Sequence, residues 1–192
     1  MPVRERTLTL AESLLLVSFD RWGVLRGPAG LAAWLAAAEL TDLVAAGRIT
    51  VRDGVVAVLN AQPPGNPMLD DALAMLHPGL RVRDHLETRT VDLLRAYLQA
   101  LCDAGLIRRR LRRLWHPRYE LLIAAPSVAD VLAPCLADPA APVPSLAAYL
   151  VRSGLAAGQL PAVELAKLRD ALPRDGITEI VPRVAGATDA QS

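Results

Sequence analysis

Long hydrophobic runs, aromatic residues and cysteines are all scarce in this chain of 192 residues. Although 53% of the residues are hydrophobic, no apolar run reaches the roughly 18 residues that a membrane-spanning helix needs. The first residues, MPVRERTLTLAES, carry charge and lack the apolar segment and cleavage site of a signal peptide. We therefore expect a cytoplasmic protein that is free or peripherally bound to a membrane.

Aromatic residues make up only 4% of the chain, so its core must consist mainly of leucine, valine and alanine. These residues favour helix packing over a β-sandwich. The two cysteines, Cys102 and Cys135, form no CxxC pair, so neither a zinc site nor thioredoxin-like chemistry is predicted. We expect two reduced, buried thiols.

Enzyme signatures are also missing, since the chain contains no GxSxG, HExxH, phosphate-binding P-loop or GxGxxG. None of the three histidines, His77, His85 and His116, has a nucleophile or metal partner at a recognisable spacing. The neighbouring carboxylates Asp70 and Asp71 fall in the first turn of a predicted helix, where they suit the helix dipole. We predict no catalytic residue, no metal site and no cofactor, and hence a binding or structural protein rather than an enzyme.

Local patterns predict helices along most of the chain. Thr9 and Glu12 have the spacing of a capping box at the start of a helix over 10–19. A second helix between Pro28 and Gly47 is apolar on most sides, which is typical of a buried helix. Further helices are expected at 68–76, 88–104, 127–137, 145–155 and 161–172. In the helix over 88–104, one predicted buried face contains Val91, Leu94, Tyr97, Leu98 and Leu101.

Two β-hairpins are expected to decorate these helices. Asp53-Gly54 is a preferred pair for a type I′ turn and predicts a hairpin over about 49–59. A second hairpin is predicted over about 106–123, with Trp115-His116-Pro117 at its bend. The predicted fold is mainly α, a single compact helical domain over 8–181 with hairpin decorations and a disordered tail over 182–192.

The net charge of +1 conceals an uneven distribution. Between Arg81 and Arg118 there are ten arginines and four acidic residues, whereas lysine occurs only at Lys167. Six of these arginines lie in RRRLRRLWHPRY, residues 108–119, which contains no acidic residue. Since arginines point to both faces of a strand in this segment, we expect it to project into solvent. Trp115 and Tyr119 suit the headgroup layer of a membrane, so an anionic bilayer is the favoured ligand.

Four segments resemble the bacterial branch of the Golgi phosphoprotein 3 family in order and spacing: LTLAESLLL (8–16), AELTDLVAAGRI (38–49), PPGNPMLDDAL (63–73) and LCDAGLIRR (101–109). The resemblance covers about residues 8–172 and implies a compact, mostly helical domain with hairpins. It also implies binding of phosphatidylinositol 4-phosphate, membrane-protein clients and self-association through a hairpin.

The eukaryotic headgroup pocket of this family uses one tryptophan and three arginines. Counted without gaps, these positions fall on Gly27, Ala36, Val91 and Leu94, so the motif is not matched. Close to these positions stand Trp22, Arg26, Arg89 and Arg95. The predicted lipid-binding residues are these four together with the hairpin residues Arg108, Arg109, Arg110, Arg112, Arg113, Trp115 and Arg118.

Two other functions compete with attachment at the inner membrane surface. A helix followed by a basic hairpin also occurs in winged-helix proteins, whose arginines contact nucleic-acid phosphates. The preceding helix argues against this reading, because Arg89 and Arg95 stand alone there beside Asp92 and Asp103. The other alternative is a scaffold whose hairpin contacts an acidic protein.

Overall fold

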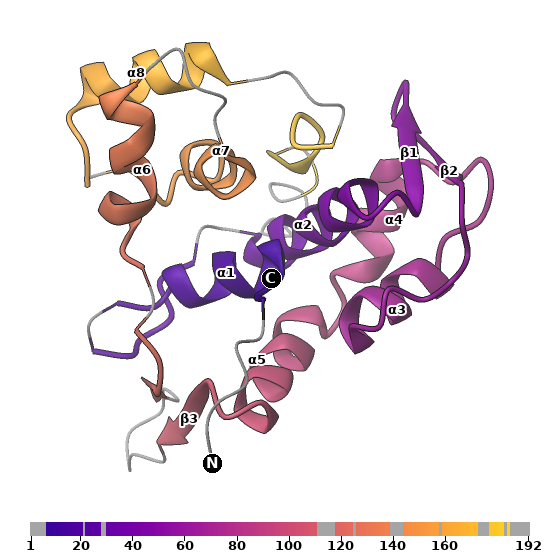
Figure 1. Ribbon diagram of the computed structural model, residues 1–192, viewed down its shortest axis with the longest axis horizontal. Coiled ribbons are helices and arrows are strands. Elements are labelled where there is room, and N and C mark those ends of the chain that lie inside the picture. Colours follow the sequence, from indigo (N-terminus) through magenta and orange to yellow (C-terminus); the bar gives the residue numbers. More distant parts are fainter. Residues whose placement is uncertain are drawn as a thin grey trace.

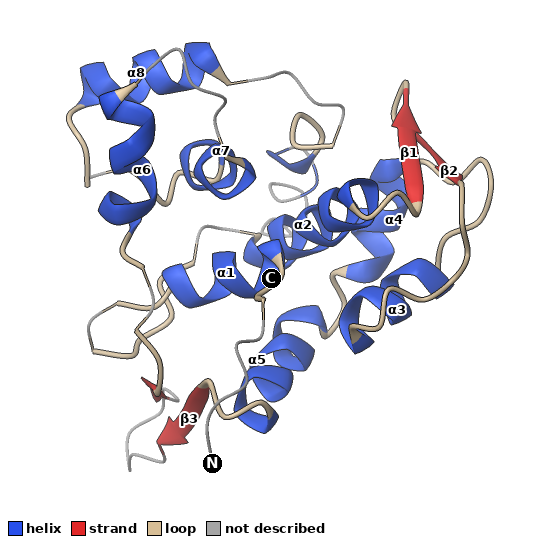
Figure 2. Cartoon of the chain, viewed as in Figure 1, coloured by secondary structure: helices blue, strands red, loops and turns tan. Residues whose placement is uncertain are grey.

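The computed structural model describes residues 7–20, 22–27, 30–110, 118–124, 126–138, 144–157, 159–172, 177–182 and 184. Within these residues the chain forms eight α-helices and two separate antiparallel hairpins (Figures 1 and 2). The helices are α1 (Leu10–Val17), α2 (Leu31–Ala45), α3 (Pro67–Ala74), α4 (Val82–Arg89), α5 (Leu93–Asp103), α6 (Val128–Ala137), α7 (Ser145–Arg152) and α8 (Ala162–Ala171). The strands are β1 (Ile49–Arg52), β2 (Val55–Val58), β3 (Ile107–Arg110) and β4 (Arg118–Leu121). The predicted mainly-α fold is confirmed.

Helix α2 forms the centre of the fold, as its all-round apolar sequence predicts. It packs against α1, α3, α4 and α5. Helix α7 packs against α1, α6 and α8 (Figure 1). The small residues Ala36, Ala37 and Ala38 are completely buried, which lets neighbouring helices approach closely. Tyr149 of α7 packs edge-on against Trp34, with ring centroids 5.8 Å apart. The core therefore surrounds α2.

Helix α1 begins with the predicted capping box. The Thr9 hydroxyl accepts the Glu12 amide at 3.1 Å, and the Glu12 carboxylate accepts the Thr9 amide at 2.9 Å. Asp42 of α2 accepts the amide of Leu10 at 2.9 Å, which fixes the start of α1 to α2. Burial, together with the charges of Glu12 and Glu39, raises the pKa of Asp42 to about 6.

The turn of the β1–β2 hairpin also matches its prediction. Asp53 has φ 52° and Gly54 has φ 71°, and both positions of a type I′ turn require positive φ. The register pairs Arg52 with Val55 and Val51 with Val56 across this turn. The Asp53-Gly54 pair was therefore sufficient to predict this turn from the sequence.

The helix predicted over 88–104 is confirmed over Leu93–Asp103 as α5, but its predicted start is wrong, because a separate helix, α4, ends at Arg89. Asp92, at φ 58°, lies in the left-handed region between them. The Thr90 hydroxyl donates to the carbonyl of Glu87 at the end of α4. Val91, expected in the core, is 75% exposed, and Leu93 is buried.

The helices predicted at 127–137, 145–155 and 161–172 are confirmed as α6, α7 and α8. Of the predicted tail, Pro182 and Val184 are within the described residues, and Val184 is buried. The remainder, 183 and 185–192, lies outside them. In the described part of the chain, every helix is too short or too polar to cross a bilayer.

Candidate functional site

The β3–β4 hairpin has two chemically different faces. Its register pairs Ile107 with Leu121, Arg108 with Glu120, Arg109 with Tyr119 and Arg110 with Arg118. Because side chains alternate along a strand, the inner face consists of Ile107, Arg109, Tyr119 and Leu121. The outer face consists of Arg108, Arg110, Arg118 and Glu120. Arginines lie on both faces of β3, as predicted, while β4 adds Tyr119 and Leu121 to the inner face.

The arginines of the outer face are exposed. Arg110 forms an ion pair with Glu120, with 2.7 Å between Nη2 and a carboxylate oxygen. Arg118 lies directly opposite Arg110, and like charges at such positions destabilise a hairpin. Among the described residues, no carboxylate forms an ion pair with Arg108 or Arg118. The outer face therefore keeps an excess of positive charge.

Tyr119 does not lie in the position expected of a headgroup anchor. Its ring is half-buried and packs against Phe19, with centroids 5.6 Å apart. The expectation that Tyr119 faces a membrane is therefore wrong, since this ring attaches the hairpin to the chain after α1.

The segment 18–27 between α1 and α2 forms a compact loop around Asp20. One carboxylate oxygen of Asp20 accepts the amides of Trp22 at 2.8 Å and Val24 at 2.9 Å, and the other accepts Arg26 Nε at 2.7 Å. Hydrogen bonds from Arg26 and from these amides lower the pKa of Asp20 more than its slight burial raises it. Trp22 and Arg26 thus extend from a loop that a single carboxylate organises.

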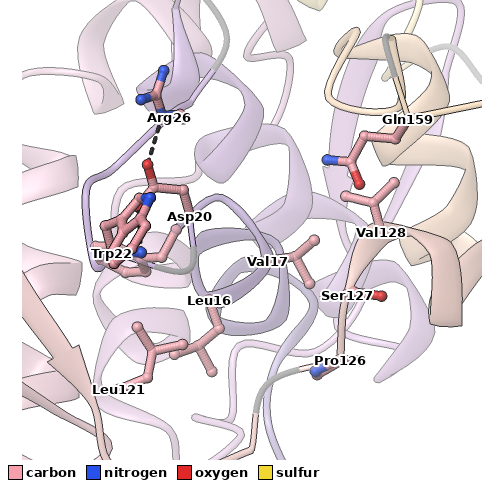
Figure 3. Close-up of a pocket in the computed structure, with 11 residues that line it drawn as sticks. Leu16, Val17, Asp20, Trp22, Arg26, Leu121, Pro126, Ser127, Val128 and Gln159 are labelled. Atoms are coloured by element: carbon pink, nitrogen blue, oxygen red, sulfur yellow. Dashed lines mark hydrogen bonds and ion pairs between the residues drawn. The ribbon is translucent and has the colours of Figure 1, made fainter.

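A pocket of about 570 Å³ lies between this loop and the start of α6 (Figure 3). Trp22, Arg26 and Leu121 line one side of it, and Val128 and Gln159 line the other. Its charged groups, Asp20 and Arg26, are already paired with each other. The pocket is therefore mainly apolar in its chemistry.

Arg95 lies elsewhere, on the exposed side of α5. Together with Arg109, Tyr119 and Leu98 it lines a second pocket of about 410 Å³, between α5 and the inner face of the hairpin. Cys102, predicted to be buried, is only half-buried in this pocket, whereas Cys135 is buried and both thiols are free. The structure thus places Arg95 beside Arg109.

Arg89 is engaged inside the fold. Its Nε and Nη2 donate to the two carboxylate oxygens of Glu39, both at 2.9 Å, and Nη2 also donates to the carbonyl of Met68. The Tyr97 hydroxyl donates to the same carboxylate at 3.0 Å. Burial raises the pKa of Glu39, and the hydrogen bonds from Arg89 and Tyr97 oppose that rise. This network, Glu39–Arg89–Tyr97, ties α2 to α4 and α5.

The predicted lipid-binding residues therefore fall into separate places. Trp22 and Arg26 share a loop, Arg95 and Arg109 share a pocket, and Arg89 is held by Glu39. The outer face contains Arg108, Arg110 and Arg118. Arg112, Arg113 and Trp115 lie outside the described residues.

Sequence reasoning missed the partners of these arginines. Glu39 is a charged residue in a helix predicted to be buried on most sides, and such a residue requires a buried partner. That signal was present in the sequence, but it did not identify Arg89 as the partner. Glu120 was missed because it follows the arginine-rich segment directly.

The described residues form no metal site, and one histidine is buried without a partner for its ring nitrogen. In the ranges that the structure describes, no three histidine, cysteine, aspartate or glutamate side chains gather into a metal site. His85, on the inward side of α4, is 2% exposed, and its Nε2 has no hydrogen-bond partner among the described residues. Burial and the nearby Arg89 charge lower the pKa of His85 to about 4. We assign it no chemical role.

Comparison with known proteins gives one result for nearly the whole chain. The family model described as Golgi phosphoprotein 3 matches residues 10–186. The comparison with curated proteins gives no match.

Proposed function

The chain belongs to the Golgi phosphoprotein 3 family, and from this premise we propose that it is a peripheral membrane protein that binds anionic lipid headgroups. The binding surface is the outer face of the β3–β4 hairpin. The family is one of non-enzymatic lipid-binding and adaptor proteins, so the proposal includes no catalytic step. The membrane concerned is the inner membrane, at its cytoplasmic face.

One observation carries this proposal: Arg110 and Arg118 lie directly opposite each other, with Arg108 on the same face and Glu120 as the one acidic residue. Like charges across a hairpin repel, and Glu120, which pairs with Arg110, can neutralise only one of the three arginines. Lipid phosphates would relieve that repulsion. Each arginine near an anionic leaflet contributes about 1 kcal/mol.

A specific phosphatidylinositol 4-phosphate pocket receives less support from the contacts. Recognition by Trp22, Arg26, Arg89 and Arg95 together would require these side chains to converge on one headgroup. Arg89 is instead bound to Glu39, while Arg95 lines a different pocket from Trp22 and Arg26. We therefore propose attraction to anionic headgroups in general.

Vesicle sedimentation tests the proposal. The full chain is mixed with vesicles of phosphatidylcholine, with and without phosphatidylserine. We expect binding only to the anionic vesicles, and the variant R108S/R110S/R118S should bind about 100-fold more weakly, since three arginines contribute about 3 kcal/mol. Raising the salt concentration should weaken binding of the unsubstituted protein, because salt screens exposed charges.

The control variant R52S/R81S/R169S removes the same charge from exposed positions outside the hairpin. It should bind nearly as well as the unsubstituted protein. Equal losses in both variants would mean that net charge, rather than the hairpin, governs binding, and the proposal would be wrong.

Binding to duplex DNA, measured beside binding to vesicles, separates the two alternatives. Binding to mixed-sequence duplex DNA with a steep salt dependence, and none to anionic vesicles, would favour a nucleic-acid function. Binding to neither would leave the protein scaffold as the better interpretation. The α5 helix beside the hairpin offers little to DNA, because the exposed Arg95 is accompanied by Asp92 and Asp103.

A further inference from the structure

We infer that Trp22 is a second membrane contact, which enters the headgroup layer beside the hairpin and fixes the orientation of the domain on the bilayer. This inference rests on the proposed function. It adds an apolar, oriented contact to an attachment that would otherwise be purely electrostatic.

Trp22 is unusually exposed for a tryptophan. Its side chain is 64% exposed, whereas Trp34 in the core is 3% exposed. Tryptophan is a large side chain that is highly buried on average, so such exposure suggests a ligand or partner. An indole combines an apolar ring with a polar N–H, which suits the boundary between lipid headgroups and acyl chains.

Backbone hydrogen bonds order the loop that presents Trp22. Besides the Asp20 carboxylate bonds, the Asp20 amide donates to Val24 O at 2.9 Å, and the Arg26 amide donates to Ser18 O at 2.8 Å. Phe19 and Leu25 also pair as an isolated β-bridge across the loop. These bonds close the base of the loop, so the exposed position of Trp22 is built into the local structure.

This loop is attached to the β3–β4 hairpin. The Tyr119 amide donates to the carbonyl oxygen of Gly23 at 2.9 Å. Gly23 follows Trp22 in the chain, and Tyr119 follows Arg118 in β4. Gly23 has φ 69°, and an added Cβ would lie 1.7 Å from the Tyr119 carbonyl oxygen. Only glycine allows this approach. Trp22 and Arg118 of β4 are therefore held in one fixed arrangement.

The charges around Trp22 suit an anionic surface. The Arg26 side chain is 73% exposed, and the loop's one described carboxylate, Asp20, is already paired with it. Leu121 of β4 lines the same pocket as Trp22, so the loop and the hairpin border a common surface (Figure 3). An anionic bilayer fits both parts of this surface, since phosphates would meet the arginines while the indole enters the interface.

Fluorescence of Trp22 provides the test. In the full chain, the substitutions W34F and W115F leave Trp22 as the sole tryptophan. On addition of phosphatidylcholine vesicles containing phosphatidylserine, we expect a blue shift of its emission. Phosphatidylcholine brominated near the headgroup should quench this emission more strongly than phosphatidylcholine brominated near the chain end.

Affinity measurements extend the test in the otherwise unsubstituted protein. W22A should bind anionic vesicles about tenfold more weakly. L59A is the matched control, because Leu59 is also 64% exposed but lies next to the other hairpin, after β2. Its affinity should not change.

The outcomes distinguish this inference from the proposed function. Normal binding to anionic vesicles, with unchanged Trp22 emission and no effect of W22A, would overturn the inference and leave the hairpin proposal standing. Absence of vesicle binding by the unsubstituted protein would overturn both. Equal losses for W22A and L59A would also overturn the inference, because any exposed apolar side chain would then serve.

Discussion

Replacement of Arg89 by alanine should destabilise the fold severely. The side chain of Glu39 is 0% exposed, and among the described residues Arg89 donates two of the three side-chain hydrogen bonds to its carboxylate. Without Arg89, a buried carboxylate would keep only the hydrogen bond from Tyr97. Leaving such a charge without its partner costs about 3–5 kcal/mol. This is a large part of the roughly 5–15 kcal/mol that stabilises a typical domain.

Urea unfolding followed by circular dichroism measures this loss. A cost of about 4 kcal/mol and a slope of about 2 kcal/mol per M would lower the midpoint by about 2 M. The matched control is R83A, which removes the ion pair between Arg83 and Glu87 at 2.8 Å. Both side chains of that pair are largely exposed, so its loss should cost less than about 1 kcal/mol.

A double substitution identifies the cause of the loss. In R89A/E39Q the buried group is neutral, so much of the stability lost in R89A should return. Equal midpoints for R89A and R83A would refute the reasoning, because the buried pair would then behave like a surface pair. Failure of E39Q to rescue R89A would show that lost packing, rather than an uncompensated charge, explains the effect.

The remaining predictions concern two buried titratable groups and one glycine. His85 has a pKa lowered from 6.5 to about 4, so its contribution to stability is present above pH 6.5 and is lost as the pH falls toward 4. Asp42 has a pKa raised from 3.8 to about 6, so its contribution is present below pH 3.8 and is lost as the pH rises through 6. In thermal melts between pH 6.5 and 4, D42N should therefore lose stability more steeply on acidification than the unsubstituted protein does. H85F should lose stability less steeply than the unsubstituted protein. Curves parallel to that of the unsubstituted protein would contradict both assignments. G23A should cost about 2–4 kcal/mol in urea unfolding, because its Cβ would overlap the Tyr119 carbonyl and break the bond between loop and hairpin. G47A, also at positive φ but with open space around its Cβ, should cost only about 1 kcal/mol, and equal losses would argue against the close contact at Gly23.

Sequence reasoning succeeded where the determining contacts are local. The Thr9–Glu12 capping box and the Asp53-Gly54 turn each involve groups at most three residues apart, and both formed as predicted. One prediction was wrong although its contacts are also local: the helix expected over 88–104 begins only at Leu93. Asp92 adopts positive φ and separates α4 from α5, although its sequence context reads as helical.

The candidate site was less predictable because its important contacts are distant in sequence. Arg89 and Glu39 lie 50 residues apart, and no periodicity connects them. The inward position of Tyr119 depends on Phe19, which belongs to the chain after α1. Residue type alone suggested that Arg89 and Tyr119 face a ligand, whereas packing turned both toward the protein.

The contact between Gly23 and Tyr119 has a consequence for the order of folding. The two residues lie roughly a hundred positions apart, and such long-range contacts form late, because much of the chain must first be brought together. On a ribosome, the loop that presents Trp22 emerges well before β4. Until β4 has been synthesised, the loop that presents Trp22 lacks the strand that fixes it. A chaperone has the best access to this loop at that stage.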